Sequence, residues 1–269
     1  MIHSVVRIIG DVRNKSTGTL ERRSLGTGFC IGVRSESVEN RSYAYIVTAQ
    51  HVVEGQPNPE LLFPDPLAPG KLYQPVPTEG PDWLHPMEQL DLAVLPFTRP
   101  DGYWINMLML DMHLLEHLPG EAMLAMPFHY VGLLEPLDRA MARSGNLGAV
   151  YEERIAHPDG YEYVCHLGDC RSYGGFSGSP CFIEISMPGL TATEPPIPPP
   201  PEFGEVGRMQ YLHLLCGMVT WHLEPAAERD ESSIFGVVCI LTSDDIWGAL
   251  MSDELCEERR KKDESAAAP

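Results

Sequence analysis

Positive charge is scarce in this chain of 269 residues, which holds 19 lysines and arginines against 38 aspartates and glutamates. The formal net charge at pH 7 is therefore −19. Binding to nucleic acid or to an anionic membrane requires a basic face that neutralises phosphates, and this composition offers little material for one. We therefore expect neither nucleic acid nor a membrane as the main partner.

Long apolar runs are missing as well. No run approaches the roughly 20 apolar residues of a membrane-spanning helix, and the first residues do not show the basic and then apolar order of a secretory signal. The cysteines are odd in number, and several lie inside apolar runs, as buried thiols do. They are Cys30, Cys165, Cys170, Cys181, Cys216, Cys239 and Cys256. We expect free thiols and a reducing compartment, the cytoplasm.

What the chain does contain is a serine between glycines. Residues 174–178 read Gly-Gly-Phe-Ser-Gly. Glycines on both sides permit backbone angles and close approaches that a Cβ would prevent. A nucleophile loop needs both when its amides must face a substrate oxygen. Ser177 is therefore the candidate nucleophile.

A serine hydroxyl is a weak nucleophile until a base accepts its proton and a carboxylate orients that base. Residues 44–53 form a β-branched apolar run that contains a histidine, which indicates a buried strand with His51 at its end. Asp91 opens a second apolar run, where a carboxylate would be buried and would need a partner. His51 is the candidate base and Asp91 the candidate orienting acid.

The order histidine, aspartate, serine separates the fold families that share such a triad. It is the chymotrypsin order, whereas subtilisins run acid, histidine, serine and α/β-hydrolases run serine, acid, histidine. Four motifs occur in the matching order: Gly-Thr-Gly-Phe at 26–29, Thr-Ala-Gln-His at 48–51, Asp-Leu-Ala-Val-Leu at 91–95 and Gly-Phe-Ser-Gly-Ser-Pro at 175–180. Over roughly residues 20–250 the chain resembles the trypsin/chymotrypsin-like serine peptidases, in particular their bacterial members without disulfides.

The resemblance implies an all-β fold of two six-stranded antiparallel β-barrels, with the active site between them and a C-terminal helix. The N-terminal barrel would span residues 1–110 and carry the base and the acid. Residues 111–120 would connect the barrels, and residues 121–256 would form the C-terminal barrel with the serine and the terminal helix. Residues 257–269 are charged and then rich in alanine, and we expect them to be a frayed tail.

The resemblance also assigns a substrate-binding region. Residues 217–222 resemble the strand that pairs with a bound peptide and forms one wall of the specificity pocket. The candidate substrate-binding residues on this strand are Thr220, Trp221 and His222. Arg171 and Ser172 would lie near the pocket floor. An inward Arg171 would favour an acidic side chain before the scissile bond, an outward one would leave a small or apolar pocket, and the sequence does not separate the two.

Two residues depart from the family pattern. Ser179 replaces a glycine, a change that a small side chain tolerates. Phe176 stands where members activated by cleavage carry an aspartate that pairs with a new N-terminus. We therefore expect a protein that folds directly into its working form.

The pattern predicts a serine endopeptidase that acts on a protein or peptide substrate, with no cofactor and no metal. His51 would take the proton of Ser177, Asp91 would orient the imidazole, and the backbone amides of Gly175 and Ser177 would form the oxyanion hole. One alternative is a binding or scaffold protein that keeps the fold without useful activity. A second is an esterase of the α/β-hydrolase type, but Ser179 breaks its G-x-S-x-G signature and no convincing acid and histidine follow.

Three further patterns have a plainer interpretation. His-Leu-Leu-Glu-His at 113–117 matches a metallopeptidase pattern, but five residues match by chance, and we interpret it as a helix face. Cys165, His166 and Cys170 lack the second pair of ligands that a four-coordinate zinc site needs. The proline-rich residues 195–201 are interpreted as a stiff hairpin insertion, with docking to a protein partner as the alternative.

Overall fold

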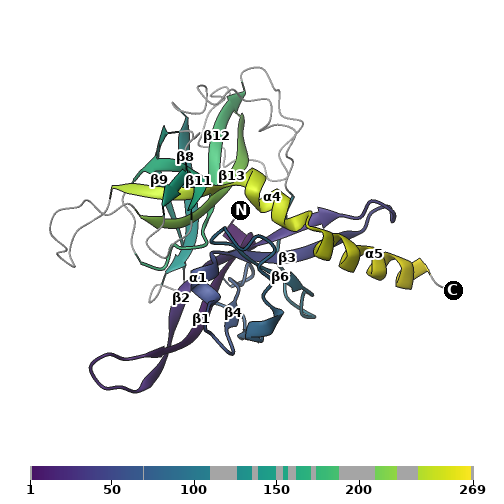
Figure 1. Cartoon of the computed structure of the whole chain (residues 1–269), viewed down its shortest axis with the longest axis horizontal. Coiled ribbons are helices and arrows are strands. Elements are labelled where there is room, and N and C mark those ends of the chain that lie inside the picture. Colours follow the sequence, from purple (N-terminus) through teal and green to yellow (C-terminus); the bar gives the residue numbers. More distant parts are fainter. Residues whose placement is uncertain are drawn as a thin grey trace, which may run out of the picture.

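The protein is described by a computed structural model that covers residues 2–68, 70–109, 126–134, 139–149, 154–156, 162–170, 174–187, 210–222 and 236–267. Strands predominate in these ranges and form two separate sheets (Figure 1). The first half of the chain builds one sheet and the second half builds the other. This is the predicted two-barrel, all-β architecture with helices at the C-terminal end.

The first sheet follows the strand order β5, β4, β1, β2, β3, β6, with β7 added beside β2. Its strands are β1 (Val5–Arg13), β2 (Leu20–Arg34), β3 (Ser42–Thr48), β4 (Glu60–Leu62), β5 (Val76–Pro77), β6 (Ala93–Phe97) and β7 (Leu108–Met109). All neighbours are antiparallel except β7, which runs parallel to β2. Among the described strands β5 does not pair with β6, so this barrel is open on one side.

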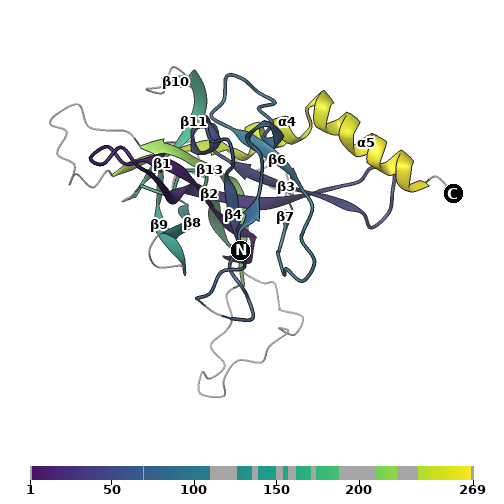
Figure 2. The same ribbon diagram turned by 90° about the horizontal axis from the view of Figure 1, so that it is seen from below.

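Strand β2 changes character along its 15 residues. Residues 20–25 are exposed or half-buried and pair with β1 in a hairpin that projects from the body, whereas residues 26–33 are all buried. Figures 1 and 2 show that β2 crosses the molecule, with the β1 hairpin at one end and the β3 hairpin beside helix α5 at the other. The apolar Phe29, Ile31 and Val33 of the buried part lie in the first hydrophobic core. This buried part includes Thr27, which contacts the serine loop described below.

The second sheet closes into a barrel. Its strands are β8 (Pro127–Leu134), β9 (Arg139–Ala149), β10 (Arg154–Ala156), β11 (Glu162–Asp169), β12 (Pro180–Met187), β13 (Gln210–His222) and β14 (Val237–Thr242). The path runs β10, β11, β14, β13, β12, β8, β9, and an additional pairing of β11 with β9 joins its two sides. Six strands therefore form a closed ring, with the aromatic rings of Phe128, Tyr130 and Phe176 buried in its core.

The helices are short except at the C-terminus. They are η1 (Ile2–Ser4), α1 (Gln50–Val53), η2 (Gly80–Asp82), α4 (Ser243–Leu250) and α5 (Asp253–Ala267). Helix α4 begins where the Thr242 side chain accepts a hydrogen bond from the Asp245 amide, with two aspartates in the first turn that favour the helix dipole. None of the helices in the described ranges combines the length and apolar character needed to cross a membrane.

The expectation of a frayed tail from residue 257 is wrong for the described residues, because α5 continues to Ala267 and docks on the first sheet. The Asp263 carboxylate accepts hydrogen bonds from Ser35 at 2.8 Å, from Ser37 at 2.7 Å and from the Tyr43 hydroxyl. Arg259 donates to the Tyr45 hydroxyl at 3.1 Å. The charged composition is typical of a solvated tail. In the structure, two of these charged residues, Arg259 and Asp263, bond to hydroxyl groups of the β2–β3 hairpin and of β3. A contact between segments so far apart cannot be predicted from one sequence.

All seven cysteines are free thiols, and six of them are buried. The structure contains no disulfide among these cysteines. Burial raises the pKa of the Cys30 thiol and of the Cys216 thiol to about 12 each, which keeps both groups protonated. These cysteines act as small apolar side chains of the core.

Candidate active site

The two candidate partners His51 and Asp91 are in direct contact. The ring atom Nδ1 of His51 lies 2.7 Å from Oδ2 of Asp91, and the His51 backbone amide donates to Oδ1 at 3.0 Å. The Asp91 side chain is fully buried and the His51 side chain is 31% exposed. An ionised carboxylate only accepts hydrogen bonds, so the proton on this side of the ring belongs to Nδ1 and the other ring nitrogen, Nε2, is an acceptor.

Strand register explains why these residues meet although 40 positions separate them. Strand β3 pairs with β6, and Thr48 at the end of β3 lies opposite Ala93 at the start of β6. Three residues beyond Thr48 the chain has entered helix α1 with His51, and two residues before Ala93 it carries Asp91. The predicted strand ends at Thr48, so His51 lies on the short helix that follows and not in the strand itself. The expectation that a buried Asp91 has a partner agrees with its contact with His51.

The serine loop is held against the first sheet by its backbone. The Thr27 amide donates to the Ser177 carbonyl at 2.8 Å, and the Thr27 hydroxyl donates to the Gly175 carbonyl at 2.9 Å. On the other side the Gly178 amide donates to the Val219 carbonyl of β13 at 2.7 Å. The loop is therefore fixed between strands of both sheets, with Ser177 half-buried at the seam.

Gly26 shows how close the serine lies to the histidine helix. A Cβ at this position would be 2.9 Å from the Ser177 carbonyl oxygen and 2.7 Å from a methyl group of Val52, the residue after His51. The backbone of the serine and the side chain next to the histidine thus approach the same glycine from two sides. The structure thus places the Ser177 backbone beside the short helix that carries His51, which in turn contacts Asp91.

The loop conformation also depends on glycine at position 178. Gly178 has φ +83°, and a Cβ there would stand 1.8 Å from the Thr27 carbonyl oxygen. The same carbonyl accepts a hydrogen bond from the Thr48 hydroxyl at 2.7 Å. The sequence analysis identified the glycine-rich pattern but missed the roles of Thr27 and Thr48, whose signal was their position inside the motifs at 26–29 and 48–51.

The candidate oxyanion hole lies at the start of the loop, where Gly175 has φ +96°. In this loop the amides of Gly178 and Ser179 donate to carbonyls, at 2.7 Å and 2.9 Å. Across the described ranges of the chain, no carbonyl accepts a hydrogen bond from the amides of Gly175 or Ser177. Both amides are those that the sequence analysis assigned to the oxyanion hole.

Phe176 anchors the loop from below. Its side chain is fully buried and meets the Tyr130 ring edge to face, with the ring centroids 5.0 Å apart and an interplanar angle of 88°. A Cβ on Gly132 would lie 2.6 Å from the Phe176 ring and 2.8 Å from the Ser179 hydroxyl, so only glycine fits at 132. The loop is therefore held at position 176 by an apolar contact with Tyr130. Family members that are activated by cleavage would have an aspartate here, paired with the new N-terminus.

Ser179, the second departure from the family pattern, is fully buried. Its hydroxyl has no hydrogen-bond partner within the described residues. A buried hydroxyl without a partner is destabilising. The small side chain is tolerated because Gly132 leaves space beside it.

The candidate substrate-binding strand is β13. Thr220 is buried and its hydroxyl donates to the Cys239 carbonyl at 3.3 Å, while Trp221 is half-buried. His222 lies opposite Val238 of β14 in the sheet. Arg171 and Ser172 lie outside the described residues, so the two orientations of Arg171 remain open.

The described residues contain no group of three His, Cys, Asp or Glu side chains arranged to hold a metal ion. Burial lowers the pKa of His166 to about 4, so this histidine is neutral at pH 7. The pattern at 113–117 and the proline-rich residues 195–201 lie outside the described residues.

Comparison with known proteins agrees with this geometry. Residues 26–184, more than half of the chain, match the trypsin-like peptidase domain family. The chain therefore belongs to the trypsin-like peptidases, and the predicted family is confirmed. A comparison with curated proteins gave no match.

Two solved structures show the same fold. A variant of the HtrA-type protease AlgW with a bound decapeptide matches at a TM-score of 0.54 and 12% identity, covering 94% of this chain and 64% of that one. The protease domain of MamO from Magnetospirillum magneticum matches at a TM-score of 0.51 and 15% identity, covering 93% of this chain and 97% of that one. The chain thus spans less than two thirds of the AlgW chain, and at these identities the likeness shows the chymotrypsin-like fold alone.

Proposed function

We propose that this peptidase is a serine endopeptidase with His51, Asp91 and Ser177 as its catalytic triad. The observation that carries the proposal is the double hydrogen bond from His51 to the buried Asp91, at 2.7 Å and 3.0 Å, next to the clamped serine loop. Two hydrogen bonds to one carboxylate fix the position and the tautomer of the ring. A buried carboxylate that orients a partly exposed imidazole is the arrangement that a general base requires.

In the proposed mechanism Nε2 of His51 accepts the proton of the Ser177 hydroxyl as the oxygen attacks the carbonyl carbon of the substrate. Asp91 stabilises the imidazolium that forms. The amides of Gly175 and Ser177 donate to the oxyanion, and His51 then returns its proton to the leaving amine. Water attacks the acyl-enzyme by the same route and restores the serine.

The proposed substrate is a protein or peptide. The AlgW structure contains a decapeptide, which supports a peptide ligand for this fold. We place the extended peptide along residues 220–222 at the end of β13, the strand that the family resemblance assigns to substrate binding. Thr220, Trp221 and His222 would line this peptide, with Arg171 and Ser172 nearer the side chain before the scissile bond.

The proposed location is the cytoplasm, or another reducing compartment. It is supported by the seven free thiols. A fluorescent fusion of the full chain, followed by fractionation, tests this location independently of activity.

A fluorophosphonate probe tests the triad, because such a probe reacts with an activated serine hydroxyl. We expect wild-type protein to be labelled, and labelling to be lost in Ser177→Ala and in His51→Ala. Ser179→Ala is the matched control, since it removes a serine two positions away that has no role in the mechanism, and it should label like wild type.

Labelling of Ser177→Ala at the wild-type rate would refute the assignment of the nucleophile. Absence of labelling in correctly folded wild-type protein would instead favour the scaffold alternative. Hydrolysis of casein by the same variants then shows whether labelling reflects peptidase activity.

A further inference from the structure

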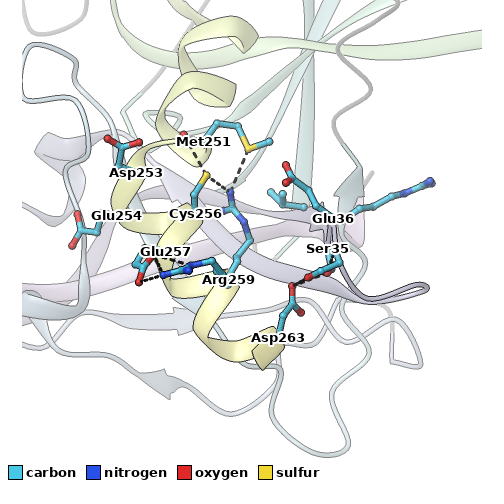
Figure 3. A pocket seen from close by; sticks show the side chains of 13 residues that line it. Ser35, Glu36, Met251, Asp253, Glu254, Cys256, Glu257, Arg259 and Asp263 are labelled. Carbon is cyan, nitrogen blue, oxygen red and sulfur yellow. Dashed lines mark hydrogen bonds and ion pairs between the residues drawn. The ribbon is translucent and has the colours of Figure 1, made fainter. Parts of the chain in front are cut away.

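Of the hollows that adjoin helix α5, two differ in the charge of their lining: one has an excess of acidic residues and the other has only basic charges. The larger, about 980 Å³, lies between α5 and the β2–β3 hairpin, and Figure 3 shows the side chains that line it. Its acidic lining residues are Glu36, Asp253, Glu254, Glu257 and Asp263. Arg259 lies at its floor, where it donates to the sulfur atoms of Met251 and Cys256 (Figure 3). This hollow matches the acidic character of the whole chain.

The second hollow, about 440 Å³, has the opposite character. It lies between the start of β3, the segment after β6 and α5, and three cations line it: Arg41, Arg99 and Lys262. None of the described residues that line it is acidic. Three cations and no carboxylate among the described lining residues are unexpected in a chain of net charge −19, so the charge of this lining is opposite to that of the chain.

The three cations differ in how far their charge is offset. Arg41 lies 3.5 Å from Asp263 and stacks over the Tyr43 ring, and Lys262 pairs with Glu258 at 2.6 Å. Arg99 is exposed and forms no ion pair within the described ranges. Arg99 is therefore the cation best placed to receive a ligand's charge.

The rest of the hollow is apolar. Cys30 and Ile105 are buried in its floor, Phe97 and Tyr45 form part of its wall, and Met107 is 40% exposed at its edge. A strongly hydrated ion such as free phosphate gains nothing from such a surface. A ligand with an anionic head and an apolar body would contact both the cations and the apolar residues of the hollow. The volume of the hollow lies within the range of small-molecule sites.

We propose that this hollow binds a carboxylate attached to a short apolar body. Guanidinium groups pair with carboxylates through two parallel hydrogen bonds, which fits the head of the ligand to Arg99 and Arg41. Two sources share this chemistry: a medium-chain fatty acid and the C-terminal residue of a peptide with an apolar side chain.

The hollow is separate from the catalytic seam. It is lined by the first residues of β3, whereas the last residue of that strand, Thr48, precedes the histidine helix. The lining residue of β3 nearest to Thr48 is Tyr45, and three residue steps along a strand correspond to about 10 Å. The proposed site therefore does not depend on the peptidase mechanism.

Isothermal titration calorimetry tests the proposal with the full-length Ser177→Ala protein, which cannot hydrolyse a peptide ligand. The probes are octanoate, octanamide, inorganic phosphate, and acetyl-Leu-Leu with either a free carboxylate or a C-terminal amide. We expect octanoate or the free-carboxylate peptide to bind at one site, and the tighter of the two identifies the source. The amides, which keep the apolar body and lose the charge, should bind at least about tenfold more weakly.

Variants locate the site. Arg99→Gln and Lys262→Gln should each weaken carboxylate binding by about tenfold, whereas Arg260→Gln, which removes a positive charge from the other side of α5, should not. Met107→Asp places a repelling carboxylate at the apolar edge without changing the core, and it should weaken binding as well. Circular dichroism verifies that each variant is folded.

Three results would overturn the proposal. These are no saturable binding of either carboxylate at millimolar concentration, equal binding of acids and amides, and binding that Arg99→Gln and Met107→Asp leave unchanged. Phosphate binding as tight as that of octanoate would overturn the assigned ligand class, because the apolar floor would then contribute nothing.

Discussion

Replacing Asp91 by asparagine is the sharpest test of the proposed triad. The Asp91 carboxylate accepts two hydrogen bonds from the same residue: the backbone amide of His51 at 3.0 Å and its Nδ1 at 2.7 Å. Asparagine has the same shape but offers one oxygen and one NH₂ group. The asparagine oxygen can therefore accept a hydrogen bond from only one of the two His51 donors, and its NH₂ group must face the other.

The backbone amide cannot change its proton, but the imidazole can change its tautomer. The asparagine oxygen should therefore keep the bond to the His51 amide, and its NH₂ group should face Nδ1, which must then be the acceptor. The ring proton moves to Nε2, the atom that has to accept the proton of Ser177. The variant thus keeps all three side chains in place and loses the base.

In serine peptidase triads in general, this loss costs about 10⁴-fold in kcat. That factor corresponds to about 5.4 kcal/mol of transition-state stabilisation. We expect a decrease of this size in kcat/KM for a fluorogenic peptide and in the rate of fluorophosphonate labelling. The second readout matters because it reports the activation of Ser177 without depending on how a substrate binds.

Asp245→Asn is the matched control, because it makes the same substitution at a half-buried carboxylate that is bonded to Thr242 at the start of α4 and lies away from the seam. It should keep wild-type kinetics. Thermal unfolding, followed by circular dichroism, verifies that both variants are folded. Asp91→Asn protein that is folded and retains kcat/KM within tenfold of wild type would refute the argument from the tautomer.

Three other changes probe the loop and the terminal helix. Gly178→Ala should abolish casein hydrolysis and lower the unfolding temperature, since its Cβ would stand 1.8 Å from the Thr27 carbonyl at φ +83°; wild-type activity would contradict this. Ser179→Ala removes a buried hydroxyl without a described partner, so chemical denaturation should show unchanged or higher stability, by about 1 kcal/mol, and a clear loss would mean that the hydroxyl is bonded. Hydrogen bonds from Tyr43, Ser37 and Ser35 and the nearby charge of Arg41 hold the pKa of Asp263 below its ordinary value of 3.8. Its stabilising effect is therefore complete above about pH 4 and lost as the pH falls through the lowered folded-state pKa, so Asp263→Asn should flatten the acid side of the stability curve, whereas exposed Glu264→Gln should not.

The segments that carry the candidate site residues could be predicted from the sequence because each is encoded locally. A β-branched run that ends at His51, an acid at the start of another run and glycines around Ser177 each specify short-range backbone structure. The order of the three residues then selected one fold family. What the sequence did not contain is the set of contacts that hold the loop: the Thr27 amide and hydroxyl meet a loop 148 residues away, and no periodicity indicates such a pair.

The part of the terminal helix beyond residue 256 was missed for a related reason. Its last turns are almost entirely charged, with ion pairs such as Lys262 to Glu258 at 2.6 Å that stabilise a helix only slightly. Composition alone therefore predicts fraying. The helix persists because Arg259 and Asp263 reach polar groups of the first sheet, which is tertiary structure and overrides local propensity.

Strand β3 connects helix α5 to the candidate residues His51 and Asp91. Tyr43 and Tyr45, near the start of β3, contact Asp263 and Arg259 of α5, and the chain leaves the other end of β3 directly into the helix that carries His51. The register of β3 on β6 sets the distance between His51 and Asp91, because Thr48 must stay opposite Ala93. A slip of one residue would turn each β3 side chain to the opposite face, so that the tyrosine contacts with α5 and the pairing of His51 with Asp91 would fail together. The contacts of α5 therefore help to specify the one register in which the candidate base and its acid can meet.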